Sequence, residues 1–412
     1  LHYAAGDARI LVPIWESLQA KVGHFKLETV INIEHRCLPA VLWMSVMGVP
    51  LNMERWLAVA ETEMGRADDL RDGLNGLIWD ILEPGEVVNW NSPVQVKKVF
   101  AALGYTLEST NFETLSHIED PVAQKLTEYR TAIKRVGTYG RNWQEFYHNG
   151  RVYPSWRQIG AVSGRMSSTD PAMQTIPHLE GEPYRSCIEA PPGYVLVIAD
   201  YSQIELRIAA KIANEEKMRA AYDQRADLHT LTAQQVLGVS EVTKADRQLA
   251  KAVNFGLLYG MGAPKFRRYA RLQYGVEMTE TQALEYVAAF FKAYPGLKRW
   301  HRSQSNEPAT IRTLAGRWRI GIEMYSEKLN SPVQGTGADG LKMALALLWE
   351  RRALCPTAYP ILACHDEIVI AVPEDDAEQA QEWLVQCMLD GMTWLLHPLP
   401  VEVEANIGKS WG

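Results

Sequence analysis

The segment 194–212 changes its hydrophobic pattern at a single acidic residue. Residues 194–199 form a short apolar run rich in β-branched side chains, as expected of a buried strand. After Asp200 the apolar residues Ile204 and Ile208 recur with helical spacing. The pattern predicts a strand followed by a helix, with a carboxylate at the junction. An isolated Asp there is most often a turn or cap residue, but a rigid strand end beside a cleft also suits a metal ligand.

A second apolar segment, 361–372, is interrupted at its centre by His365, Asp366 and Glu367. Charged residues buried without partners in such a run would be costly. A hairpin turn that presents two carboxylates to a metal avoids that cost. The pattern therefore predicts two strands joined at these three residues, and a further alternating strand at 401–407.

The segment 244–260 is predicted to be a helix with an unusual stripe. Arg247, Lys251, Phe255 and Tyr259 follow one another at steps of four, so they share one slowly drifting face. An apolar stripe would simply be core. Two cations followed by two aromatic rings can instead hold a triphosphate and stack on a base.

The remaining chain is organised more coarsely. Residues 25–150 are expected to be mainly helical, and 151–193 are rich in turn formers, with Arg165 following a glycine that permits close backbone approach. Thr243 and Asp246 predict a helix cap, and Gly256 and Gly260 indicate close packing or motion. Further helices are expected at 56–82, 94–103, 121–137 and 338–351, the last introduced by 330–335.

Composition narrows the class of protein. The 412 residues are 47% hydrophobic, enough for several cores, and no apolar run approaches the roughly 20 residues of a membrane span. Five scattered cysteines without a CxxC pair argue against a zinc site or disulfide framework and favour a reducing cytoplasm. The net charge is −7, yet residues 241–320 carry 14 Lys+Arg against 6 Asp+Glu. One basic region on an acidic body is typical of a protein that meets phosphates in one place.

Two carboxylates and a cationic helix together meet the needs of two-metal phosphoryl transfer. Asp200 and Asp366 can bind a pair of Mg²⁺ ions, for which Mn²⁺ can substitute, while fixed cations neutralise a departing pyrophosphate.

Three motifs also resemble those of a known family. Residues 200–207, DYSQIELR, are similar to motif A of the family A DNA polymerases, the bacterial and phage DNA polymerase I group. Residues 247–260 are similar to motif B, and His365-Asp366-Glu367 to motif C. The resemblance covers essentially the whole chain. It implies an α+β right-hand fold, with an antiparallel-sheet palm and mainly helical fingers and thumb.

The resemblance implies a division of the chain and a set of site residues. The divisions are a remnant of an upstream 3′→5′ exonuclease domain (1–22), palm-associated helices (23–50), thumb (51–150), palm with motif A (151–210), fingers with motif B (211–324) and palm with motif C (325–412). The implied catalytic residues are Asp200, Asp366, Glu367 and Lys251, and the metal ligands are Asp200, the Tyr201 carbonyl and Asp366. The implied nucleotide-binding residues are Gln203, Glu205, His229, Arg247, Lys251, Phe255 and Tyr259, and those that bind DNA are Lys134, Arg165, Asn330, Gln334 and His365.

The implied activity is template-directed addition of dNTPs to a primer 3′-OH. The expected partners are a primer-template duplex and dNTPs, with no membrane, and the expected state is a monomer in the cytoplasm of a bacterial or virus-infected cell. Tyr3 and Asp7 match the motif that ends the family's exonuclease domain. The other nuclease carboxylates would precede Leu1, so no proofreading is expected of this chain.

Several alternatives stay open at this point. Glu205 either blocks a ribose 2′-OH or only completes a capping box with Ser202. Phe255 either packs on the sugar of the nucleotide or belongs to the core, and the charges around Lys134 are either a duplex contact or a solvated face. At the level of the whole chain, an inactive primer-template-binding subunit and a single-subunit RNA polymerase compete with the DNA polymerase. Retention of both Asp200 and Asp366 disfavours the first, and Glu205 disfavours the second.

Overall fold

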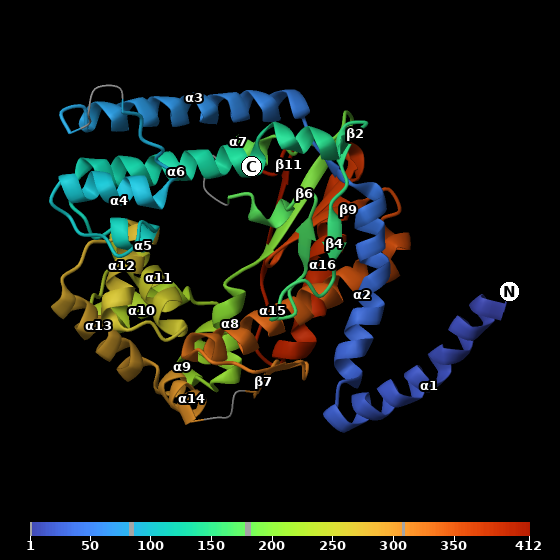
Figure 1. Cartoon of the computed structure of the whole chain (residues 1–412). Coiled ribbons are helices and arrows are strands. Elements are labelled where there is room, and N and C mark those ends of the chain that lie inside the picture. The colour runs from blue at the N-terminus through green and yellow to red at the C-terminus, as the bar shows by residue number, and fades with distance from the viewer. Residues whose placement is uncertain (1, 82–85, 178–182, 307–309) are drawn as a thin grey trace. The chain divides into compact units, whose positions relative to one another are not determined.

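The computed structural model describes residues 2–81, 86–177, 183–306 and 310–412 (Figure 1). These residues form two compact units, each built from several stretches of chain. Unit 1 comprises Leu1–Gly48, Ser155–Gln174 and Ala190–Lys409, and unit 2 comprises Val49–Pro154, Thr175–Glu189 and Ser410–Gly412.

A four-stranded antiparallel sheet lies at the centre of unit 1 (Figure 1). Its order is β11-β6-β10-β9, so the first strand of the sheet along the chain, β6, is enclosed by later ones. The bounds are β6 (Tyr194–Tyr201), β9 (Tyr359–Cys364), β10 (Glu367–Pro373) and β11 (Val403–Gly408). The turn between β9 and β10 consists of His365 and Asp366, and His365 adopts a φ of +58°. The four strands and the turn predicted from the apolar pattern are confirmed.

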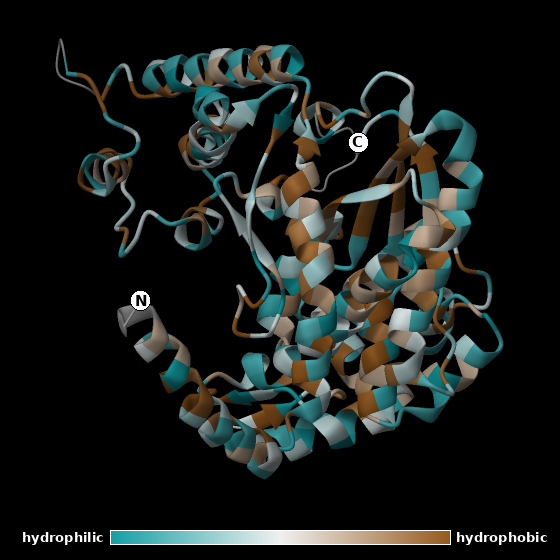
Figure 2. Ribbon diagram, turned by 90° about the vertical axis from the view of Figure 1, so that its right-hand side faces the viewer, coloured by the Kyte–Doolittle hydropathy of each residue, from teal (hydrophilic) through white to brown (hydrophobic). Residues whose placement is uncertain are grey.

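Long helices cover this sheet and create the main core. They are α2 (Glu28–Met47), α15 (Tyr325–Glu350) and α16 (Ala377–Leu396). Helix α16 packs on β6, α2 packs on β9, and α15 lies against both α2 and α16. Val195, Leu196, Val197 and Ala199 of β6 are all buried, which explains the continuous apolar run. The hydropathy colouring of Figure 2 shows the strands of the sheet as predominantly hydrophobic.

Helix α15 corrects one prediction. The sequence places its start after 330–335, but the helix begins at Tyr325 and passes through Pro332. A proline inside a helix removes a hydrogen bond and costs about 3 kcal/mol. Here the hydroxyl of Ser331 donates to the Glu327 carbonyl at 2.5 Å, and that of Thr336 donates to the Pro332 carbonyl at 2.6 Å. Neither bond replaces the helical bond from residue 332 to the Lys328 carbonyl, so burial of most of the helix is what offsets the cost.

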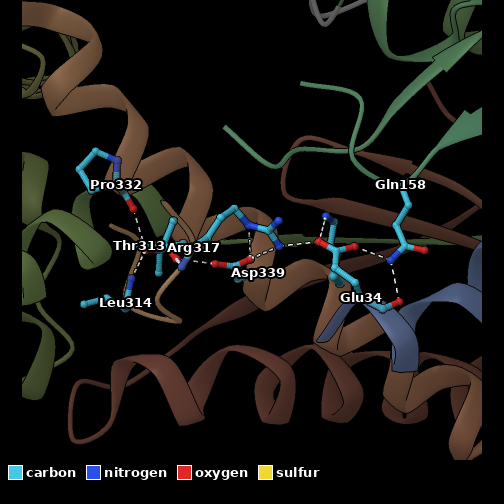
Figure 3. Close-up of polar contacts among 9 residues, drawn as sticks. Glu34, Gln158, Thr313, Leu314, Arg317, Pro332 and Asp339 are labelled. Atoms are coloured by element: carbon cyan, nitrogen blue, oxygen red, sulfur yellow. Dashed lines mark hydrogen bonds and ion pairs between the residues drawn. The ribbon is translucent and has the colours of Figure 1, made fainter. Parts of the chain in front are cut away.

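A cluster of buried charges ties α15 to α2 (Figure 3). Arg317 donates to Asp339 at 2.7 Å and also contacts Glu34 of α2. Lys342 donates to Glu34 at 2.6 Å, and Thr313 donates to Asp339 at 2.7 Å. Two cations thus balance two carboxylates where α2, α15 and the hairpin of β7 (Thr310–Arg312) and β8 (Trp318–Ile320) meet.

A group of shorter helices belongs to unit 1 as well. Their bounds are α8 (Ile204–Ile212), α9 (Glu216–Asp223), α10 (Leu228–Thr232), η3 (Ala233–Leu237), α11 (Lys244–Leu258), α12 (Ala263–Tyr274), α13 (Glu280–Ala293) and α14 (Pro295–Asn306). The predicted cap of α11 is confirmed as a reciprocal capping box between Thr243 and Asp246. Gly256 packs closely, since a Cβ there would lie 2.9 Å from the Phe266 ring. Gly260 has a φ of +73°, and a Cβ at this position would lie 2.7 Å from the Tyr325 ring.

Unit 1 also contains α1 (His2–Phe25), β4 (Ser155–Arg157), β5 (Ser167–Thr169), η4 (Arg352–Leu354) and η5 (Glu374–Asp376). Strands β4 and β5 pair antiparallel in the turn-rich segment. None of the described helices has the length and apolar character needed to cross a membrane. All five cysteines are free and buried.

Unit 2 is mainly helical, as its sequence predicts. Helices α3 (Met53–Leu77) and α6 (Pro121–Tyr139) pack along each other, beside α4 (Pro93–Ala102) and α5 (Phe112–Leu115). A small sheet has the order β1-β3-β2, formed by Val49–Pro50, Arg151–Val152 and Tyr147–His148. The remaining elements are η1 (Arg141–Phe146) and α7 (Pro183–Ser186). Helix α3 ends at Leu77, earlier than the predicted end at residue 82.

Candidate active site

An open pocket of about 330 Å³ lies at one end of the central sheet in unit 1. It brings together residues from β6, the β9–β10 turn, β11, α8, α10 and α11. The lining residues are Asp200, Tyr201, Ser202, Gln203, Ile204, Glu205, His229, Arg247, Lys251, Phe255, Asp366 and Glu404. Nine of the residues predicted from the sequence therefore share one pocket.

A row of carboxylates crosses the sheet beside this pocket. Asp200 of β6 is in register with Glu367 of β10 on one side and Glu404 of β11 on the other. Directly opposed residues of antiparallel strands project to the same face, where like charges repel. Asp366 is added from the β9–β10 turn, and its carbonyl accepts the Tyr201 N–H at 3.3 Å. Such a concentration of negative charge calls for a compensating cation.

The carboxylates shift one another's protonation. Burial, followed by repulsion from Asp366 and Glu367, raises the pKa of Asp200. Burial, followed by repulsion from Glu205, raises the pKa of Asp366, although Arg165 and a hydrogen bond with Asp200 oppose that rise. The pair therefore retains a proton closer to neutrality than free carboxyls do, unless positive charge binds beside it.

The donor set fits Mg²⁺ held partly by substrate. Mg²⁺ is usually bound by one or two carboxylates together with phosphate oxygens and water. Among the described residues, no group of three or more His, Cys, Asp or Glu is placed so that it could hold a metal ion. Asp200 and Asp366 together with a backbone carbonyl match the open arrangement. Tyr201 holds that strand end in place, because its buried hydroxyl donates to the Met388 carbonyl at 2.6 Å.

Helix α11 supplies the positive wall of the pocket. Arg247, Lys251 and Phe255 all line it, so the predicted stripe faces the carboxylates. Arg247 forms a two-point ion pair with Asp227, at 2.8 and 3.2 Å. Asp227 also caps α10 through the backbone N–H of Thr230. Burial opposes ionisation, but these hydrogen bonds hold the pKa of Asp227 well below its usual range.

His229 and Gln203 reach the same pocket from α10 and the start of α8. His229 is only 3% exposed, and its ring lies 5.8 Å from that of Phe255. Gln203 occupies the N-cap position of α8 with a left-handed φ of +53°. Its amide contacts Asp227 and the Tyr222 hydroxyl, each at 3.4 Å. These contacts orient Gln203 beside the two cations.

Glu205 is held by two side chains and does not cap its helix. Its carboxylate accepts a hydrogen bond from Arg165 at 2.9 Å and another from the Tyr259 hydroxyl. Helix α8 has no side-chain cap bond at its N-terminus, so the capping-box alternative with Ser202 is wrong. Tyr259 is the C-cap residue of α11 and joins the site through this bond.

A smaller pocket of about 130 Å³ contains two of the residues predicted to bind DNA. Arg165 and His365 line it together with Gln174, whose amide donates to the Ala363 carbonyl at 2.9 Å. Asn330 and Gln334 lie one turn apart on α15 and are not part of its lining. Lys134 belongs to unit 2, where it is exposed on α6.

Sequence reasoning gave no site role to three polar residues: Glu404 and Gln174, which line these pockets, and Asp227, which pairs with Arg247. Glu404 could have been found from the alternation of the last strand, which places it among residues that face one side. Asp227 could have been found as a helix cap, although its pairing with Arg247 has no local signal. Gln174 gives no sequence signal, because its position depends on a distant strand.

The fold is similar to that of a solved polymerase domain. The structure superposes with a TM-score of 0.82 on a solved structure described as the POL domain of Pol1 from M. smegmatis in complex with DNA primer-template and dNTP. The two share 23% sequence identity, and the match covers 96% of this chain and 73% of that one. The predicted α+β polymerase fold with an antiparallel sheet is confirmed.

The sequence defines the family. Residues 68–412 match the model of DNA polymerase family A, and the chain belongs to that family. DNA polymerase I of Aquifex aeolicus is 38% identical over 313 residues, which cover 74% of this chain and 53% of the relative. DNA polymerase I of Pseudomonas aeruginosa is 32% identical, covering 99% and 47%, and the thermostable enzyme of Thermus filiformis is 33% identical, covering 99% and 51%. The chain spans about half the length of these relatives.

Proposed function

We propose that this chain is a template-directed DNA polymerase that adds dNTPs to a primer 3′-OH and releases pyrophosphate. One observation carries the proposal. A single pocket has Asp200 and Asp366 on one wall and Arg247, Lys251 and His229 on another. A nucleotide triphosphate needs cations along its phosphates, and the reacting oxygens need charge compensation at the carboxylates.

The carboxylates are proposed to hold two Mg²⁺ ions, for which Mn²⁺ can substitute. Asp200, Asp366 and the Tyr201 carbonyl are the ligands, and Glu367 is a secondary carboxylate. The ions would supply positive charge to the phosphoryl oxygens and favour deprotonation of the primer hydroxyl.

The remaining residues of the pocket orient the reactants. The primer hydroxyl gives its proton to solvent, and its oxygen bonds to the α-phosphorus. The bond from that phosphorus to the bridging oxygen breaks, and the electron pair leaves with pyrophosphate. Arg247 and Lys251 neutralise the leaving group, and His229 donates a hydrogen bond to it. Phe255 packs on the sugar of the nucleotide and Glu205 excludes a 2′-OH.

Further roles follow the family resemblance. Gln203 lies near the incoming nucleotide, and Tyr259 occupies the templating position. Arg165 and Gln334 read the minor groove at the primer terminus, with Asn330 and His365 nearby, and Lys134 contacts the duplex backbone. In their support, Arg165 and His365 share one pocket next to the carboxylates. Tyr3 and Asp7 lie in α1, and their assignment to the end of an exonuclease domain stays a prediction.

Primer extension tests the proposal directly. The intact chain should extend a DNA primer on a DNA template with Mg²⁺ and dNTPs, and the Asp366→Asn variant should lose at least three orders of magnitude in rate. Parallel reactions with rNTPs or an RNA template define the substrate class. If the chain binds primer-template but neither protein extends it, the inactive binding subunit becomes the better explanation. Preferential use of rNTPs would instead favour the RNA polymerase.

A further inference from the structure

A buried chain of hydrogen bonds lies behind the pocket wall that contains His229. The hydroxyl of Tyr294, at the end of α13, is 2.7 Å from the hydroxyl of Thr232. Thr232 donates to the amide oxygen of Asn254 at 3.0 Å, and the amide nitrogen of Asn254 lies 2.9 Å from Nδ1 of His229. All four side chains are at most 3% exposed. The chain thus connects α13, α10 and α11 to one edge of the imidazole.

The direction of these bonds determines where the proton of His229 lies. Because the amide oxygen of Asn254 is occupied by the Thr232 hydroxyl, its NH₂ group faces His229. An amide NH₂ only donates, so Nδ1 must accept and the single proton of the neutral ring sits on Nε2. This leaves the Nε2–H edge for the pocket that His229 lines.

The surroundings of His229 keep the ring neutral. Burial lowers its pKa to about 4, and the nearby charges of Arg247 and Lys251 add to that effect, while Asp227 opposes it. A protonated His229 would be repelled by Arg247 and Lys251 and would lose hydration on burial. A neutral N–H donor avoids both costs and still bonds to a phosphate oxygen.

We propose that Asn254 is a positioning residue that, together with Thr232, holds His229 in its Nε2–H form as a neutral hydrogen-bond donor toward the triphosphate. Helix α11 then contacts His229 through two consecutive residues. Asn254 bonds to Nδ1, and the ring of Phe255 lies beside the imidazole. The identity of the phosphate ligand rests on the proposed polymerase function. The protonation state of His229 does not.

Nitrogen NMR of the imidazole tests the positioning role without any activity measurement. The full chain is labelled with ¹⁵N-histidine, and the His229 signals are assigned by their loss in His229→Gln. In the nucleotide-free protein we expect Nε2 to be protonated and Nδ1 to be bare. Asn254→Asp keeps the size of the side chain but presents only an acceptor, so it should move a proton onto Nδ1. Protonated Nδ1 in the wild type, or a bare Nδ1 in Asn254→Asp, would overturn the proposal.

His301 provides an internal control for folding. Its Nε2 lies 2.9 Å from the Leu258 carbonyl, so it should also be the Nε2–H form. The rings packed beside it, those of Phe291, Trp300 and Tyr325, are not altered in any variant. An unchanged His301 signal in each variant shows that α11 and its surroundings are intact. Thr232→Val, which removes the hydroxyl that orients the Asn254 amide, should give a mixture of the two His229 forms. A single unchanged form would show that Thr232 has no part in the positioning.

Binding of inorganic triphosphate tests the second half of the proposal. Its addition to the nucleotide-free protein should shift the Nε2 signal of His229 and leave that of His301 unchanged. In primer extension, His229→Gln retains a neutral N–H donor and should keep the KM for dNTP within about threefold, whereas His229→Leu should raise KM about tenfold. Equal KM values for these two variants would contradict the proposed role of His229 as a hydrogen-bond donor. A chain without extension activity would refute the proposed function, yet the NMR result would still decide the tautomer.

Discussion

Asp200 and Glu367 lie directly opposite each other across β6 and β10, and Glu404 flanks Asp200 from β11. Three carboxylates therefore cross one end of the sheet in a row, with Asp366 beside them. Like charges directly opposite each other destabilise a sheet, so the row does not contribute to stability. The row is explained if the site is completed by cations that arrive with the substrate.

The first prediction concerns stability against pH without divalent metal. The pKa of Asp200 is raised to about 8 and that of Asp366 to about 6, against an ordinary value of 3.8. At pH values between the ordinary pKa and the raised pKa of each group, the folded protein binds more protons than the unfolded chain. Its free energy of unfolding therefore falls as pH rises through this range. Asp200→Asn should therefore raise Tm at pH 8 in EDTA. The free energy of unfolding should rise by only about 1 kcal/mol, because solvent in the open pocket screens the repulsion between the carboxylates.

Addition of Mg²⁺ provides the matching control. It should stabilise the wild type more at pH 8 than at pH 6 and have a smaller effect on Asp200→Asn. An Asp200→Asn variant that melts below the wild type in EDTA at pH 8 would contradict this account of the carboxylate row.

The second prediction concerns sugar selection by Glu205. Its carboxylate is held by Arg165 and Tyr259, so it occupies a defined position in the pocket. Glu205→Ala should increase incorporation of ribonucleotides relative to deoxynucleotides by at least tenfold, measured as the ratio of kcat/KM values. Tyr259→Phe removes one bond to the carboxylate but keeps the carboxylate, and should change the ratio less. Unchanged selectivity in Glu205→Ala would rule out the gate.

The third prediction concerns the 3′ position of the nucleotide sugar. Phe255 is half-buried, lines the pocket and packs partly against the core. If its ring lies against the sugar, Phe255→Tyr should supply a hydroxyl near the missing 3′-OH and admit dideoxynucleotides. Competition between dideoxynucleotides and dNTPs in primer extension measures the effect. Equal discrimination by both proteins would assign Phe255 to the core alone.

The fourth prediction concerns the charge cluster of Figure 3. Asp339 is fully buried, and Arg317→Met would leave its carboxylate without its main cationic partner. Loss of one partner from a buried pair typically costs about 3–5 kcal/mol. Chemical denaturation monitored by circular dichroism should show this decrease in the free energy of unfolding.

A matched control for this variant joins the same two helices. Arg36 of α2 pairs with Glu350 of α15 at 2.7 Å, but this pair is exposed. Arg36→Met should therefore cost at most about 1 kcal/mol. Equal losses in the two variants would show that burial of the cluster has no special role.

The apolar pattern alone predicted the elements that carry the site. The continuous run before Asp200 predicted β6, the interrupted run around Asp366 predicted β9 and β10, and steps of four predicted the face of α11. These signals are local, because strands and helices repeat their side-chain directions over a few residues. The capping box of Thr243 and Asp246 is local for the same reason.

Only the tertiary structure decided which side chains meet. Glu404 lies beside Asp200 because β11 pairs with β6 in one register, and Glu205 bonds to Arg165 and Tyr259 rather than to its own helix. The start of α15 at Tyr325, ahead of Pro332, likewise depends on packing against α2 and α16. Asn254 has no distinguishing feature in the sequence until its amide is found on His229. Strand register and side-chain pairing depend on contacts between residues far apart in the chain, which local periodicity does not encode.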